Sequence, residues 1–207
     1  MNENFKKWFG NSKVVDDKGT PRVVYHGTTA DFDSFKNPTK AMATKVEREQ
    51  PIFFSSDAET ASAYAGKSKG ANVYPVYLRI EKPFNPFNLS EETIRYFDDL
   101  IYEESIKEGR TEDEAEEDAY QWIYQLKQGS WGILESEEVW KYLKDNNYDG
   151  FITREMGAIN YGVLSPLQVK SAIGNNGDYD PSNPDITMRE GGKVNGYFTG
   201  YLKHLNW

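Results

Sequence analysis

The chain contains no cysteine and only two histidines, His26 and His204, among its 207 residues. The absence of cysteine excludes disulfide scaffolds, cysteine nucleophiles and zinc–thiolate sites. Two histidines are also too few for a site with several histidine ligands, so we expect no metal. A chain of this length can bury a core without such staples, and it forms one domain or two small ones.

Long apolar runs are missing as well. No stretch approaches the roughly 20 apolar residues of a membrane-spanning helix. The first ten residues, MNENFKKWFG, lack the apolar run of a signal peptide. We therefore expect a cytoplasmic protein without membrane contact.

Positive charge is scarce, because 33 acidic residues face 24 basic ones and the net charge is -9. This balance disfavours a protein that coats nucleic acid. The acidity is local: residues 91–118 hold thirteen acids and three bases, a charge of -10, which leaves +1 for the rest of the chain. The argument against a nucleic-acid partner is weak for that near-neutral remainder.

The acidic segment reads as two helices separated by Gly109. The first is expected to begin at Ser90, and the second carries a capping box formed by Thr111 and Glu114. Its apolar residues recur with helical spacing at Ala115, Ala119, Trp122, Ile123 and Leu126. A solvated helical pair packed on a sheet explains this pattern, and a surface that steers a basic partner is the alternative.

The remaining elements are mostly short strands. We expect strands at 22–26, 52–54, 74–80, 151–153, 161–164 and 169–173. Two further helices are expected, at 57–66 with a capping box of Ser56 and Glu59, and at 136–145. Strands and helices do not alternate regularly, which disfavours a doubly wound parallel sheet. The pattern favours an α+β fold with mixed or antiparallel sheets and an inserted helical lobe.

The domain boundaries follow from these changes in composition. Residues 1–190 are expected to form one domain, with 88–147 as its mainly helical insert. Residues 191–207 follow a Gly-Gly break and are expected to form a C-terminal appendage. The appendage is aromatic, which suggests docking onto another surface; its rings are Tyr197, Phe198, Tyr201 and Trp207.

Two residues are candidates for chemistry. His26 ends a predicted strand and precedes Gly27, so its imidazole can face a cleft that a ligand approaches along the backbone. Tyr64 is the one bulky ring on a predicted helix of small residues. Taken alone, His26 is explained at least as well by a structural histidine, and Tyr64 is explained better by a core tyrosine. A serine–histidine–acid triad has no support, because a G-x-S-x-G motif is absent.

Four stretches, taken in order, resemble a known family. They are residues 5–15 (FKKWFGNSKVV), 24–28 (VYHGT), 52–64 (IFFSSDAETASAY) and 148–186. The set resembles the ADP-ribosyltransferase superfamily, the fold of poly(ADP-ribose) polymerases and diphtheria-type toxins. The nearest resemblance is to the domain of phage and mobile-element polyvalent proteins. It implies a split β-sandwich of two mostly antiparallel sheets with the helical lobe inserted.

The resemblance also implies a histidine–tyrosine–glutamate site that binds NAD as a substrate. By motif position, His26 would hydrogen-bond the ribose next to nicotinamide, and Gly27 would offer its backbone to the carboxamide. Tyr64 would stack on the nicotinamide ring. The same pocket would be lined by Thr28, Phe53 and Ser55. Residues 38–50 would cover the donor and offer three cations to the pyrophosphate, namely Lys40, Lys45 and Arg48.

One position departs from the family pattern. Asn160 occupies the place of the usual glutamate, in the segment Ile159-Asn160-Tyr161. Asparagine accepts a hydrogen bond but carries no charge. Glu155 lies five residues earlier and is the candidate substitute if the intervening loop folds back.

The function that the resemblance implies is mono-ADP-ribosyl transfer from NAD to a macromolecular acceptor, a protein or a nucleic acid. Such a protein would serve as a phage- or mobile-element-encoded effector or toxin, in the host cell cytosol if a phage delivers it. Two alternatives stay open. The first is an NAD glycohydrolase, with water as the acceptor. The second is a degenerate NAD-binding or interaction module, which Asn160 favours.

Overall fold

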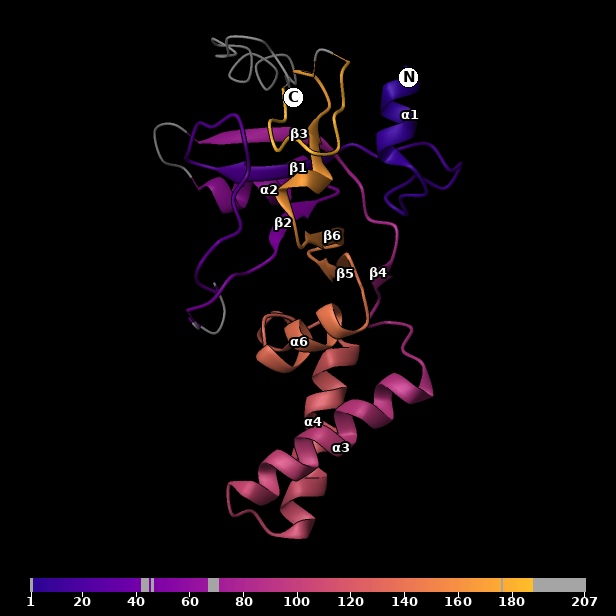
Figure 1. The fold of residues 1–207 in the computed structure, drawn as a ribbon. Coiled ribbons are helices and arrows are strands. Elements are labelled where there is room, and N and C mark those ends of the chain that lie inside the picture. Colours follow the sequence, from indigo (N-terminus) through magenta and orange to yellow (C-terminus); the bar gives the residue numbers. More distant parts are fainter. Residues whose placement is uncertain (1, 42–44, 46, 67–70, 176, 188–207) are drawn as a thin grey trace.

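The computed structural model describes residues 2–41, 45, 47–66, 71–175 and 177–187. The described strands lie at one end of an elongated molecule, and a pair of long helices projects at the other end (Figure 1). The predicted appendage, residues 191–207, lies outside the described residues.

The strands form one mixed sheet. They are β1 Val24–Thr28, β2 Ile52–Ser55, β3 Asn72–Leu78, β4 Pro83–Phe84, β5 Gly150–Glu155, β6 Ala158–Val163 and β7 Val169–Ser171. Their order across the sheet is β4-β5-β6-β2-β1-β3-β7, and every neighbouring pair is antiparallel except β4–β5. The α+β class is therefore confirmed. The expected division into two sheets is not confirmed, because hydrogen bonds join all seven described strands.

Alternation along β3 sets the main core. Tyr74, Val76 and Leu78 are buried, as their period of two predicts, and Ile80 is buried just beyond the strand end. They pack with apolar residues of β1, β2, β6 and β7. This core lies beneath the strands that carry the candidate residues.

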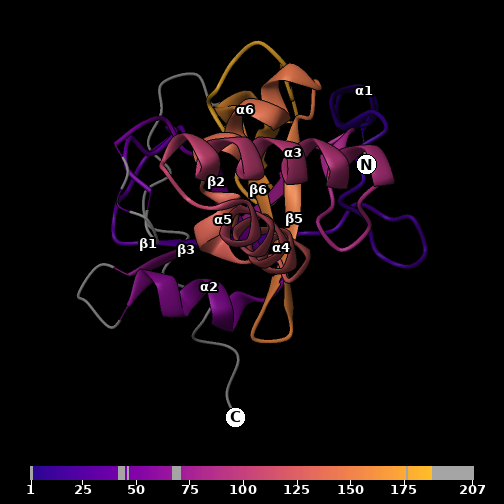
Figure 2. The ribbon, with the colours of Figure 1, turned by 90° about the horizontal axis from the view of Figure 1, so that it is seen from below.

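The helical lobe is inserted between β4 and β5. It consists of α3 Glu91–Lys107, α4 Glu112–Lys127, α5 Trp131–Leu134 and α6 Glu137–Asp145. Ser90 caps α3, and Thr111 and Glu114 form the predicted capping box of α4. Seen from below in Figure 2, α3 and α4 lie in front of the strands. A second core joins the lobe to β4 and β5 through Phe84 and Phe151.

The helix that follows β2 differs from the prediction at its start. This helix, α2, spans Ala58–Ala65, and its cap is Asp57, whose carboxylate accepts from the backbone N–H of Thr60 at 2.7 Å. The predicted cap, Ser56, instead accepts from the backbone N–H of Ile159 at 2.9 Å. The helix ends close to the predicted position, with Gly66 as its C-cap.

Three described helical segments, α5 among them, were not expected as separate helices from the sequence. Helix α1, Glu3–Phe9, packs three aromatic side chains against Tyr77 and Tyr179. The short 3-10 turn η1, Pro166–Gln168, joins β6 to β7.

Candidate active site

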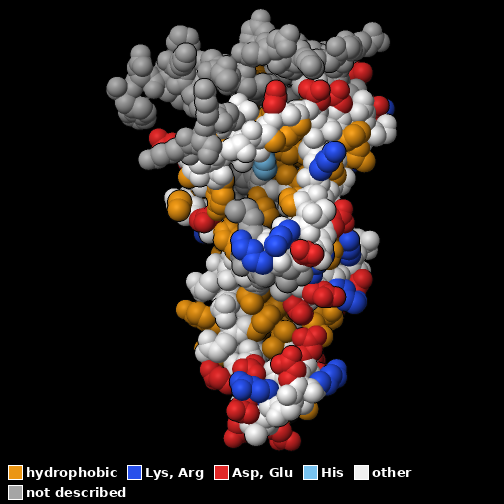
Figure 3. All heavy atoms as spheres, turned by 90° about the vertical axis from the view of Figure 1, so that its left-hand side faces the viewer, with side chains coloured by type: hydrophobic (Ala, Val, Ile, Leu, Met, Phe, Trp, Pro, Cys, Tyr) orange, Lys and Arg blue, Asp and Glu red, His pale blue; other side chains and the backbone are white. Residues whose placement is uncertain are grey.

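A pocket of about 410 Å³ lies where the sheet, α2 and the helical lobe meet. The lining residues are Tyr25, His26, Gly27, Pro38, Lys40, Gln50, Ile52, Phe53, Phe54, Ser55, Ala61, Tyr64, Trp131, Glu135 and Asn160. Figure 3 shows this side of the molecule, with a histidine side chain in a hollow among hydrophobic ones. The pocket brings together six of the predicted site residues.

His26 is held by the neighbouring strand. Its Nδ1 lies 2.7 Å from the carbonyl oxygen of Phe53, and the ring packs edge-on against Phe35. A carbonyl only accepts, so Nδ1 carries the proton and Nε2 keeps a lone pair for a hydroxyl donor. Burial lowers the pKa of His26, and the Phe53 carbonyl opposes that shift more weakly. The imidazole is therefore neutral near pH 7.

Gly27 fits a place where no side chain has room. A Cβ at this position would lie 1.7 Å from the backbone oxygen of Ala61 in α2. Strand β1 and helix α2 are therefore in direct backbone contact beside the pocket. This approach keeps the polar backbone of Gly27 at the pocket wall.

Gly27→Ala is expected to destabilise the fold by about 3 kcal/mol, because β1 and α2 must separate to admit the methyl group. The matched control is Gly132→Ala in α5, where the nearest atom to a new Cβ is 3.8 Å away. Urea denaturation of both variants measures the effect. A Gly27→Ala protein as stable as the control would contradict this description of the contact.

Tyr64 and Glu155 are directly hydrogen-bonded. The phenol of Tyr64, half of whose surface is exposed, donates to Oε2 of Glu155. Burial raises the pKa of Tyr64 well above its ordinary value, and the charges of Glu155 and Glu135 add to the effect. The phenol is therefore neutral and keeps its proton on the side of the carboxylate.

The β5–β6 hairpin brings Glu155 beside Asn160. Met156 and Gly157 both have positive φ and form a tight turn, so Glu155 pairs with Ala158. Asn160 lies two residues further along β6 and thus on the same face as Ala158. Asn160 Nδ2 donates to Oε2 of Glu155 at 3.3 Å. The folding back that the sequence left open does occur.

Asn160 offers a free acceptor to the pocket. It pairs with Ser55 across β2 and β6, and only 3% of its surface is exposed. Its Oδ1 is buried and has no hydrogen-bond partner among the described residues. A buried acceptor without a partner is rare and costly, which makes this atom a candidate for a ligand contact.

Of the other three predicted pocket residues, two line the pocket and one does not. Phe53 and Ser55 line the pocket. The Phe53 ring packs edge-on against Trp131 at 5.0 Å between centroids. Thr28 is not among the lining residues, and its hydroxyl accepts from the backbone N–H of Ala30 at 3.1 Å.

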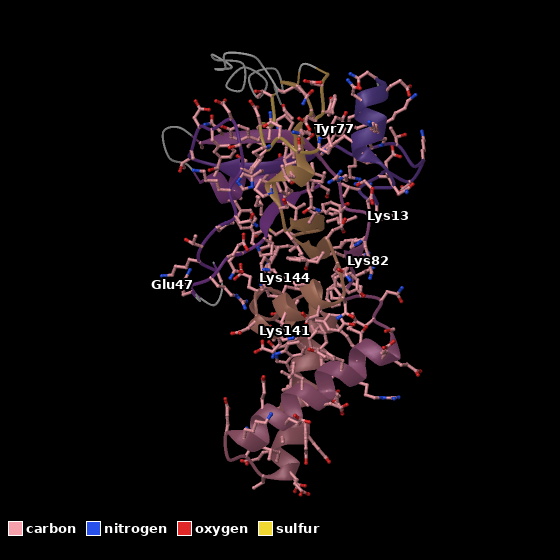
Figure 4. The ribbon with its side chains drawn as sticks, in the orientation of Figure 1. Lys13, Glu47, Tyr77, Lys82, Lys141 and Lys144 are labelled. Carbon is pink, nitrogen blue, oxygen red and sulfur yellow. The ribbon has the colours of Figure 1, made fainter. Side chains whose placement is uncertain are left out.

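The predicted covering loop has one cation at the pocket, Lys40. Arg48 instead donates to the backbone oxygen of Glu135, and Glu49 lies 3.8 Å from the ammonium of Lys144 in α6. Figure 4 shows Glu47 of this loop at about the level of Lys144. The loop is thus tied to the helical lobe at two points, and Lys45 is exposed outside the pocket lining.

Among the lining residues that the sequence analysis did not name as part of the site are Trp131 and Glu135, and Gln50 was included only as the last residue of the predicted covering loop. Trp131 is the first residue of α5 and Glu135 is its C-cap, and this one-turn helix is too short to show an apolar period. Gln50 lies between a glutamate and a proline and looks like part of a polar loop. Only the tertiary contact between the loop and the lobe reveals these positions.

The described residues contain no group of three or more histidine, aspartate or glutamate side chains that could hold a metal ion. Within the same part of the chain, every helix is too short or too polar to cross a bilayer.

Comparison with protein families shows to which family the chain belongs. The family described as ADP-ribosyltransferase in polyvalent proteins matches residues 16–179. The chain belongs to this family. No curated protein and no solved structure gives a significant match. Members of an ADP-ribosyltransferase family use NAD as a substrate and transfer its ADP-ribosyl group to an acceptor, and the matched region includes every predicted site residue.

Proposed function

We propose that this ADP-ribosyltransferase domain transfers a single ADP-ribose from NAD to a macromolecular acceptor. One observation carries the proposal: Glu155, which is not itself among the lining residues, is hydrogen-bonded to Tyr64 and Asn160, two residues that line the pocket together with His26. This arrangement supplies the negative charge that Asn160 itself lacks. Glu155 thereby contacts Tyr64 and Asn160, two positions that come from different motifs of the family resemblance.

Cleavage of NAD requires a negative charge beside the ribose that loses nicotinamide. Cleavage of the bond between ribose and nicotinamide passes through an oxocarbenium-like state, as in glycoside hydrolysis. A fixed negative charge beside the developing cation lowers the barrier. In the proposal, Glu155 supplies that charge, and Asn160 Oδ1 accepts a hydrogen bond from the ribose 2'-hydroxyl.

The remaining residues hold the donor. The Tyr64 ring stacks on nicotinamide, and the Gly27 backbone pairs with the carboxamide. The lone pair on His26 Nε2 accepts from a ribose hydroxyl. Phe53 and Ser55 complete the wall around the leaving group. Fixing both parts of the donor in this way is what makes bond cleavage effectively unimolecular.

The acceptor separates this proposal from its two alternatives. Transfer to water would make the protein an NAD glycohydrolase. A degenerate domain would bind NAD without cleaving it, as the neutral Asn160 favours. A role as a phage or mobile-element effector agrees with the kinship to polyvalent proteins and belongs to the same proposal.

The test combines two readouts on the purified protein. With labelled NAD and cell lysate, we expect label on macromolecules and nicotinamide release that rises when lysate is added. Release that is rapid and independent of lysate would instead identify a glycohydrolase. NAD binding by calorimetry without release under either condition would identify a degenerate binding module.

A further inference from the structure

Gln50 is a buried side chain whose amide is unused. Only 1% of its surface is exposed, and it lines the same pocket as His26 and Asn160. Both Oε1 and Nε2 are buried without a hydrogen-bond partner among the described residues. A buried amide that lacks partners for both its donor and its acceptor is unfavourable unless a ligand satisfies it.

The backbone of Gln50 is fixed on both sides. Its N–H donates to the carbonyl of Pro38 at 2.7 Å, and its carbonyl accepts from Asn37 Nδ2 at 2.8 Å. Pro51 follows directly and restricts the conformation of the chain. The amide is thus presented from a rigid position, which is what a recognition group requires.

Gln50 lies at the opposite end of β2 from Ser55 and its partner Asn160. It precedes the first strand residue, whereas Ser55 is the last and pairs with Asn160. An extended chain places the two Cα atoms about 16 Å apart. Tyr64 follows on α2, beyond the Ser55 end. A donor held by Tyr64 therefore presents a different part of itself to Gln50.

The amide needs a partner that both donates and accepts. The diphosphate of NAD offers acceptors alone, and the carboxamide belongs to the Tyr64 end. The adenine edge offers an amino donor at N6 beside an acceptor at N7, the pair that a glutamine side chain matches with two hydrogen bonds. We infer that Gln50 binds the adenine base of NAD, an inference that rests on the proposed function.

The most direct test compares two dinucleotides on the unaltered protein. Nicotinamide hypoxanthine dinucleotide differs from NAD at the base, where an oxygen acceptor replaces the N6 amino donor. We expect calorimetry to show that NAD binds about ten- to a hundredfold more tightly. Equal affinity for the two dinucleotides would overturn the inference.

Gln50→Leu is expected to abolish the preference, because NAD affinity falls to that of the hypoxanthine dinucleotide. Gln125→Leu, on the exposed face of α4, is the matched control and should keep the preference. Since Gln50 makes no side-chain hydrogen bond to the described residues, Gln50→Leu should not lower the melting temperature of the unliganded protein. If Gln50 were purely structural, Gln50→Leu would lower the melting temperature and leave the preference for NAD unchanged. Gln50→Met, of similar length, repeats the test if the leucine variant fails to fold.

The outcomes separate this inference from the function on which it rests. A Gln50→Leu protein that loses affinity for both dinucleotides by the same factor would place the amide against sugar or diphosphate and overturn the adenine assignment alone. If the unaltered protein binds neither dinucleotide, the proposed function and the inference are overturned together.

Discussion

Glu155→Gln is expected to slow nicotinamide release from NAD about a hundredfold or more, equivalent to roughly 3 kcal/mol of lost transition-state stabilisation. The amide oxygen of glutamine still accepts from Tyr64, so the geometry of the pocket is kept while the charge is removed. We expect kcat to fall with little change in KM, because the charge acts on the developing cation rather than on bound NAD. Single-turnover release of labelled nicotinamide measures the effect.

Glu116→Gln provides the matched control, because this glutamate is exposed on α4 and lies outside the pocket lining. It should release nicotinamide at the unaltered rate. A Glu155→Gln protein that matches this control would show that the carboxylate has no part in the reaction.

Moving the carboxylate from position 155 to position 160 tests the same role of Glu155. Asn160→Glu alone places a second carboxylate beside Glu155, where Asn160 now donates a hydrogen bond. Like charges at such a distance raise the pKa of one carboxyl group and disfavour the arrangement. We expect this variant to gain no activity, whereas combining it with Glu155→Gln should recover part of the lost rate. An active single variant and an inactive double variant would contradict the assigned role of Glu155.

His26→Ala is expected to reduce kcat/KM for NAD at least a hundredfold, since it removes both the hydroxyl acceptor and the ring that packs against Phe35 and Phe54. His26→Phe keeps an aromatic ring, slightly larger than imidazole, at this position and removes the two ring nitrogens. We expect the phenylalanine variant to be as inactive as the alanine variant but more stable. Urea denaturation and steady-state kinetics separate the two effects, and an active His26→Phe protein would refute a direct role.

The same residue gives a pH dependence of stability. Burial holds the pKa of His26 below its ordinary value of about 6.5, so the unfolded chain binds the proton more readily. Stability from the neutral ring is therefore present above about pH 6.5 and lost as the pH falls below it. The urea midpoint should fall over this range in the unaltered protein, and His26→Phe should lack that component.

Local signals predicted much of the architecture. The cap at Ser90, the capping box at Thr111 and the alternation along β3 depend on neighbouring residues, and the structure confirms all three. The α2 cap was wrong because two adjacent polar residues both qualify. Asp57 caps the helix, because the Ser56 hydroxyl accepts a hydrogen bond from the backbone of β6 instead.

The candidate site could be predicted only in part, because its key contacts join distant segments. The motif positions located His26, Tyr64 and Asn160, which now line one pocket. The contact between Tyr64 and Glu155 spans 91 positions and depends on the turn at Met156 and Gly157. The burial of Gln50 depends on the packed loop and has no signature in the sequence.

The most direct test of the proposed mechanism is a crystal structure of the slow Glu155→Gln variant with NAD. We predict the nicotinamide ring against Tyr64 and the 2'-hydroxyl of its ribose within hydrogen-bonding distance of Asn160 Oδ1 and the side chain at position 155. A bound NAD whose ribose lies away from both side chains, or an empty pocket at saturating NAD, would contradict the proposed function.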